Sequence, residues 1–152
     1  MNSTIKFRGK RIKDGKWIFG NLADYSMNVF NTAIEKKVIF SNIVSFATDN
    51  FGFVVDDCAV APDTIGQFTG LCDKNRKEIY EGDIFTVNGN YPKKIEFRPE
   101  YAAFCMANLD ELDKPYLEPW QRIRPDWWND YKREICIIGN IHDDSSLISD
   151  KQ

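Results

Sequence analysis

The stretch of residues 64–85 constrains the fold more than any other part of this sequence. Two apolar segments, 65–71 and 79–85, flank a charged, turn-forming middle. The charged middle predicts a turn at residues 73–77, and residues 81–83 predict a second turn that starts the strand at 84–87. Three glycines stand where the chain turns tightly or lets another backbone approach, which only glycine permits without strain: Gly66, Gly70 and Gly82. Five apolar side chains are expected to fill a common core: Phe68, Leu71, Ile79, Tyr80 and Ile84.

Composition favours a folded chain rich in β structure. Of the 152 residues, 43% are hydrophobic and 14% aromatic, and aromatic and β-branched side chains favour strands over helices. The net charge of −3 argues against general nucleic-acid binding, because such binding depends on Lys and Arg that neutralise phosphates. The N-terminus lacks the apolar segment of a signal peptide, and no apolar run approaches the roughly 18 residues that span a bilayer. We therefore expect a cytoplasmic protein without membrane contact.

Alternating segments elsewhere predict further strands and two regions. Residues 5–12 and 17–22 flank Asp14 and Gly15 and predict a β-hairpin, whereas residues 23–33 show no pattern and are expected to form a loop. Other strands are predicted at 37–40, 43–46, 53–55, 84–87, 94–98, 101–106 and 134–142, with turns at 49–52 and 88–90 and a short helical turn at 143–149. We expect a mainly β, β-rich α+β chain with an N-terminal β region at 1–61 and a C-terminal region at 62–152. Residues 109–131, which contain three prolines, are expected to form an insertion in the second region.

Several groups of residues, in the same order along the chain, resemble the YopX family of phage and prophage proteins. They are residues 64–71, 73–75, 77–84 and 138–141, and the opening segments 6–11 and 17–20 are similar to family N-termini. We interpret the following motif residues as structural: Gly66, Gln67, Phe68, Gly70, Leu71, Tyr80, Glu81, Gly82, Asp83, Gly139 and Asn140. Two features differ from the family pattern. Arg76 stands where a turn glycine is usual, and residues 144–147 replace an Asn-Pro-Glu-Leu sequence.

The resemblance implies a mostly β structure with a small, barrel-like C-terminal part of SH3-like or OB-like type. It also implies self-association and an origin in an integrated phage. It implies no activity and supplies no catalytic residue. We therefore expect a non-enzymatic accessory protein that needs no cofactor and acts through contacts with itself, and with an unknown phage or host protein.

Candidate reactive residues have structural interpretations as well. Glu81 and Asp83 flank a turn glycine, where carboxylates accept backbone N–H bonds. His142, the one histidine, is expected half exposed at a strand end, and a metal or catalytic role would depend on it alone. Four aspartates fit loop boundaries and helix caps, but meeting in space they would suit a divalent cation or a carboxylate-based hydrolase: Asp56, Asp57, Asp143 and Asp144. Four cysteines form no C-x-x-C pair and are expected to be small buried residues: Cys58, Cys72, Cys105 and Cys136.

Two surfaces leave alternatives open. Lys6, Arg8 and Lys10 alternate along the first strand and therefore share one face, near Trp17. This face is expected to be a solvated edge, and the alternative is a platform for a nucleic-acid backbone or a stacked base. Three tryptophans in the insertion fit either a cover over the core or an oligomer contact: Trp120, Trp127 and Trp128.

Overall fold

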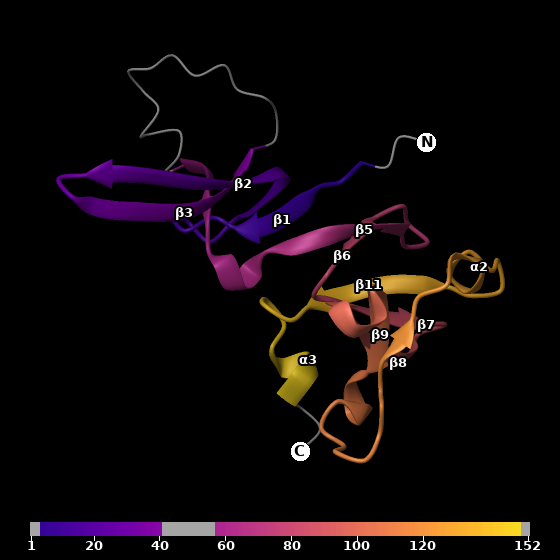
Figure 1. Cartoon of the computed structure of the whole chain (residues 1–152). Coiled ribbons are helices and arrows are strands. Elements are labelled where there is room, and N and C mark those ends of the chain that lie inside the picture. The colour runs from indigo at the N-terminus through magenta and orange to yellow at the C-terminus, as the bar shows by residue number, and fades with distance from the viewer. Residues whose placement is uncertain (1–3, 41–56, 150–152) are drawn as a thin grey trace. The chain divides into compact units, whose positions relative to one another are not determined.

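The computed structural model describes residues 4–40 and 57–149. The chain divides into two compact units, Met1–Phe68 and Thr69–Gln152, each built mainly of antiparallel strands (Figure 1). This confirms the mainly β fold class. The division lies inside a strand, beyond the boundary that the sequence suggests at residue 61. Of the helices in the described residues, none combines the length and the apolar character that crossing a bilayer requires.

The first unit begins with the predicted hairpin. Strands β1 (Phe7–Lys10) and β2 (Trp17–Val29) pair antiparallel, with Phe7 opposite Gly20 and Lys10 opposite Trp17. Gly15 adopts a φ of 69° in the connecting turn, a conformation that glycine reaches without a steric cost. The Asp-Gly signal therefore located this turn correctly.

The loop predicted at residues 23–33 is wrong. Strand β2 continues to Val29, and β3 (Thr32–Phe40) pairs with it from Asn21 onward. The turn consists of Phe30 and Asn31, with φ values of 49° and 63°. Tyr25, Met27 and Val29 alternate with the polar Ser26 and Asn28, a short period-two pattern typical of a strand, which the prediction missed.

Strand β4 (Ala59–Val60) completes the core of the first unit. It pairs with β3, and Val60 also forms a bridge to Arg11, just after β1. The approach is close at Gly9, where a Cβ atom would lie 3.0 Å from Val60 Cβ and 3.2 Å from Ile39 Cδ1. Among the described residues, the buried apolar side chains here are those of Val38, Ile39, Ala59 and Val60.

The chain then leaves the first unit through β5. A 3-10 helix, η2 (Pro62–Thr64), occupies the predicted irregular connection and leads into β5 (Gly66–Cys72). The opening residues of β5 pair with β1, with Gln67 opposite Phe7. The strands predicted at 43–46 and 53–55, and the turn between them, lie outside the described residues.

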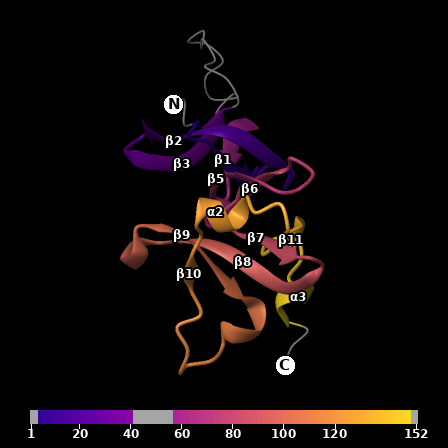
Figure 2. The ribbon, with the colours of Figure 1, turned by 90° about the vertical axis from the view of Figure 1, so that its right-hand side faces the viewer.

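The second unit contains a five-stranded antiparallel sheet in the order β10-β9-β8-β7-β11, whose strands are labelled in Figure 2. A short strand, β6 (Glu78–Tyr80), precedes the sheet and neighbours β5. The strands of the sheet are β7 (Asp83–Val87), β8 (Asn90–Arg98), β9 (Ala103–Asn108), β10 (Gln121–Arg122) and β11 (Ile135–Asn140). The predicted strands at 84–87, 94–98, 101–106 and 134–142 are thus confirmed. The barrel-like part is an open sheet and not a closed barrel, because β10 and β11 form two separate edges within the described residues.

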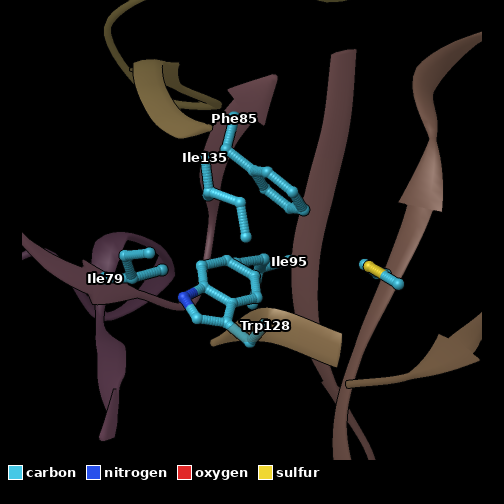
Figure 3. Packing of buried hydrophobic residues seen from close by; sticks show 6 residues of the cluster. Ile79, Phe85, Ile95, Trp128 and Ile135 are labelled. Carbon is cyan, nitrogen blue, oxygen red and sulfur yellow. The ribbon is translucent and has the colours of Figure 1, made fainter. Parts of the chain in front are cut away.

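One face of this sheet carries the larger core, shown in Figure 3. Its buried members are Ile79, Phe85, Ile95, Met106, Trp128 and Ile135. Leu71 packs against this cluster. The expectation of one common core is only partly right. Ile84 is fully buried but points to the opposite face of β7 from Phe85, because successive strand residues alternate, and Phe68 belongs to the first unit.

The predicted insertion packs onto the second unit through a short helix. Helix α2 (Pro125–Trp128) starts with a proline, which is favourable at a first helical position. It places Trp128 in the core with 4% of its surface exposed, 5.1 Å from Phe85 between ring centroids. Trp128 Nε1 donates a hydrogen bond of 2.9 Å to the carbonyl oxygen of Cys72. Near the end of the chain, α3 (Ser146–Ser149) forms the predicted helical turn.

Candidate functional site

The turn at Glu81, Gly82 and Asp83 is held by its own carboxylates. Asp83 is 2% exposed, and its Oδ2 accepts a hydrogen bond of 2.8 Å from the backbone N–H of Tyr80. Glu81 Oε1 accepts one of 3.0 Å from the N–H of Phe97. These contacts agree with the structural interpretation of the pair.

Gly82 connects this turn to two other strands. It adopts a φ of 85°, which a side chain would strain. Its N–H donates to the carbonyl oxygen of Ile95, and its own carbonyl oxygen accepts from the N–H of Ile141. The central motif therefore joins β7, β8 and the end of β11 through backbone groups.

The turn between β5 and β6 is organised by Asp73, which is 7% exposed. Asp73 Oδ1 accepts hydrogen bonds from the N–H groups of Asn75 at 2.8 Å and Lys77 at 2.9 Å. Its Oδ2 accepts a longer one, 3.3 Å, from Ile137. Arg76, which stands where a turn glycine is usual in the family, has a φ of 63°, a conformation that a side chain strains.

The Gly139 and Asn140 motif shapes the end of β11. Asn140 Oδ1 accepts hydrogen bonds from the N–H groups of His142 at 2.9 Å and Asp143 at 3.0 Å. Asp144 Oδ2 accepts from the N–H of Asn140 at 3.0 Å, and a Cβ atom on Gly139 would lie 2.4 Å from that oxygen. His142 is half-buried at the strand end, as expected.

The other candidate carboxylates have local partners too. Asp57, in the first unit, forms an ion pair of 2.7 Å with Lys13, and the hydrogen bond from Lys13 lowers the pKa of Asp57. Asp143 and Asp144 bond within the second unit, and Asp56 lies outside the described residues. Within 4–40 and 57–149, no three His, Cys, Asp or Glu side chains are grouped to hold a metal. The carboxylate-based hydrolase remains a prediction, and no contact among the described carboxylates supports it.

The cysteines differ from the expectation of uniform burial. Cys105 is fully buried, and desolvation raises the pKa of its thiol. Cys58 and Cys136 are half-buried, and Cys72 is exposed. Cys72 follows Leu71, which packs on the core, so alternation along β5 turns Cys72 outward.

The basic face of the hairpin is stacked on aromatic rings. The Arg8 guanidinium lies 4.7 Å from the Trp17 ring centroid, and Lys10 Nζ lies 5.6 Å from it. Lys6 Nζ lies 5.1 Å from the ring of Phe68, an aromatic partner that sequence reasoning did not assign to this face. Arg8 is only 6% exposed. Phe19, opposite Arg8 in register, is 47% exposed and was also missed.

The three tryptophans of the insertion have three different environments. Trp128 belongs to the core, whereas Trp127 is half-buried under the guanidinium of Arg133, at 4.9 Å. Trp120 lies beneath Arg98, at 4.9 Å, and Lys94, at 5.9 Å. An oligomer contact remains a prediction for Trp120 and Trp127.

The first unit has two features that sequence reasoning missed. Phe30 is 99% exposed at the tip of the β2–β3 hairpin. A cavity of about 510 Å³ lies at the side of the same ribbon. Its lining residues are Ile12, Asp24, Tyr25, Ser26, Glu35, Lys36, Lys37, Val60 and Pro62. The only sequence signal was the absence of any charge between residues 27 and 34.

Comparisons with known proteins agree with this architecture. A family model described as YopX protein matches residues 6–149. The crystal structure of protein EF1440 from Enterococcus faecalis is similar, with 20% sequence identity and a TM-score of 0.52, over 95% of this chain and 98% of that chain. At this identity the likeness concerns the fold alone. A comparison with curated proteins gives no match.

Proposed function

The chain belongs to the YopX protein family, and from this premise we propose that it is a non-enzymatic accessory protein, of phage or prophage origin, that works through protein–protein contacts as a homo-oligomer. The observation that supports this is Phe30. Its aromatic ring is almost fully in water, and its φ of 49° costs a bulky residue about 1–2 kcal/mol. A partner that buries the ring offsets both costs.

Self-association is testable in solution. We expect sedimentation velocity to show a weight-average mass that rises above the 17.6 kDa of the monomer as the concentration increases from about 1 µM to about 100 µM, the range in which micromolar affinities are populated. A mass that stays monomeric across this range would contradict the homo-oligomer.

A second candidate function is binding of single-stranded nucleic acid at the basic hairpin. Lys6 and Lys10 provide charge, and the half-exposed Phe19 provides a ring on which a base can stack. Arg8 is too buried to reach a phosphate. It supports the face by holding Trp17.

This candidate predicts a salt-sensitive interaction. At low salt, a fluorescently labelled oligothymidine should bind, and the double variant Lys6→Glu with Lys10→Glu should weaken binding by at least about tenfold, with a salt slope lower by about 0.7 for each phosphate that is no longer neutralised. Lys132→Glu is the matched control, because Lys132 also lies over an aromatic ring, Tyr131, but in the second unit. No binding by the unmodified protein would end this candidate.

A further inference from the structure

The tip of the β2–β3 hairpin and the cavity beside it are complementary, and each chain carries both. We propose that in a dimer Phe30 of each copy inserts into the cavity of the other, around a two-fold axis. This inference rests on the proposed function, because it identifies the partner as a second copy and assigns the contact.

The tip has the properties expected of a segment that inserts into a partner. The pairing of β1 with β2 reaches only to Gly20, and β4 pairs with β3 at Lys37 and Val38, so in the described pairing the ribbon is two-stranded between Tyr25 and Lys36. A two-stranded ribbon on its own is marginally stable in water. Phe30 and Asn31 both have positive φ, and no charged residue occurs from 27 to 34. Burying this tip therefore desolvates no charge.

The cavity has the lining and the volume expected of a site that accepts an aromatic side chain. Ile12, Tyr25, Val60 and Pro62 supply its apolar lining. Ile12 is 63% exposed and Pro62 is exposed, whereas Val60 is buried, so Ile12 and Pro62 are the parts of the wall that a partner can reach. A volume of about 510 Å³ falls in the range of sites that enclose a ligand larger than one aromatic ring.

The position of the cavity along the ribbon allows a closed dimer. Tyr25 and Phe30 are five positions apart on β2, which corresponds to about 17 Å at roughly 3.4 Å per residue. Two ribbons that lie antiparallel and overlap by this length bring each tip to the other cavity. The two contacts are identical, so the assembly closes at two copies.

The charges around the cavity permit this overlap. Its rim carries two acidic and two basic side chains, Asp24 and Glu35 with Lys36 and Lys37, and Asp24 is ion-paired with Lys37 within one chain. Two such rims meet without net repulsion although the whole chain carries −3.

The overlap also indicates the size of the contact. A length of about 17 Å, or about five residue pairs, covers roughly 160 Å² of one face by strand dimensions, and a seated aromatic ring adds about 200 Å². The sum is about 700 Å² over both partners, in the range of weak, transient interfaces. We therefore expect a weak dimer, populated toward the upper end of the range from about 1 µM to about 100 µM.

The test separates the tip from the cavity. In sedimentation velocity, Phe30→Asp should weaken dimerisation at least tenfold, and so should Ile12→Asp, which places a charge in the cavity wall at an exposed position. Tyr116→Asp is the matched control, because Tyr116 is 95% exposed in the second unit. An equimolar mixture of the Phe30→Asp and Ile12→Asp variants should associate more tightly than either alone, since it retains one intact pair of tip and cavity. Circular dichroism confirms that each variant is folded.

The outcomes distinguish this inference from the broader function. If the unmodified protein dimerises and Phe30→Asp dimerises equally well, the tip contact is wrong and self-association stands. If the unmodified protein stays monomeric, both fail. A monomer that floats with phosphatidylcholine–phosphatidylglycerol vesicles in a Phe30-dependent way overturns the dimer and assigns the tip to a lipid surface.

A photo-crosslinking residue at position 30 should label peptides that contain Ile12 or Tyr25 of the other copy, and labelling elsewhere contradicts the proposed contact.

Discussion

Replacing Trp128 by alanine is expected to lower the free energy of unfolding of the second unit by about 3–5 kcal/mol, as for other large aromatic residues removed from cores. Trp128 is in contact with a cluster whose other members come from the strands β6, β7, β8, β9 and β11. The substitution leaves a cavity among them and also removes the hydrogen bond to the carbonyl of Cys72. A loss of this size is a large fraction of the total stability of a small domain.

Urea unfolding followed by far-ultraviolet circular dichroism measures this effect without relying on tryptophan fluorescence. Tyr131→Ala is the matched control, because this aromatic residue follows the same helix but is 89% exposed. We expect the control to change stability by less than about 0.5 kcal/mol. A Trp128→Ala variant as stable as the control would mean that α2 does not hold the core.

The parts of the fold that were predictable have local signals. The hairpin at Asp14 and Gly15, and the one at Asn88 and Gly89, are marked by residues that adopt positive φ at little cost, and both turns form where expected. The core strands β7 and β11 are recognisable by their β-branched runs, because burial selects those side chains.

The errors concern two features, the β2–β3 ribbon and the division of the core. The β2–β3 ribbon turns at Phe30 and Asn31 without a glycine, so the usual turn signal is weak, and the short alternation of Tyr25, Met27 and Val29 with polar residues was missed. Ile84 and Phe85 are adjacent on β7 and point to opposite faces, so they do not share one core. Which of the two faces carries the larger core depends on the neighbouring strands.

The candidate surfaces show the same contrast. Alternation along β1 correctly grouped Lys6, Arg8 and Lys10, but the aromatic partner of Lys6 is 62 residues away, at Phe68. The cavity beside β2 combines residues from four segments of the first unit, which only the folded chain brings together. Local pattern therefore identified the basic face and could not identify the cavity.

Replacing Asp83 by alanine is expected to cost about 2–3 kcal/mol, the second largest loss that we predict. The buried N–H of Tyr80 loses its acceptor, and an unsatisfied buried donor costs more than the hydrogen bond itself contributes. Asp83→Asn keeps one acceptor oxygen and should cost less.

Glu81→Ala is the matched control, because the bond of Glu81 to Phe97 is exposed and water can replace it, and its cost should stay below about 1 kcal/mol. Urea unfolding measures the loss in the free energy of unfolding for each of the three variants and so ranks them. Equal losses for Asp83→Ala and Glu81→Ala would show that Asp83 does not hold the turn, and its burial as a carboxylate would then need a functional explanation.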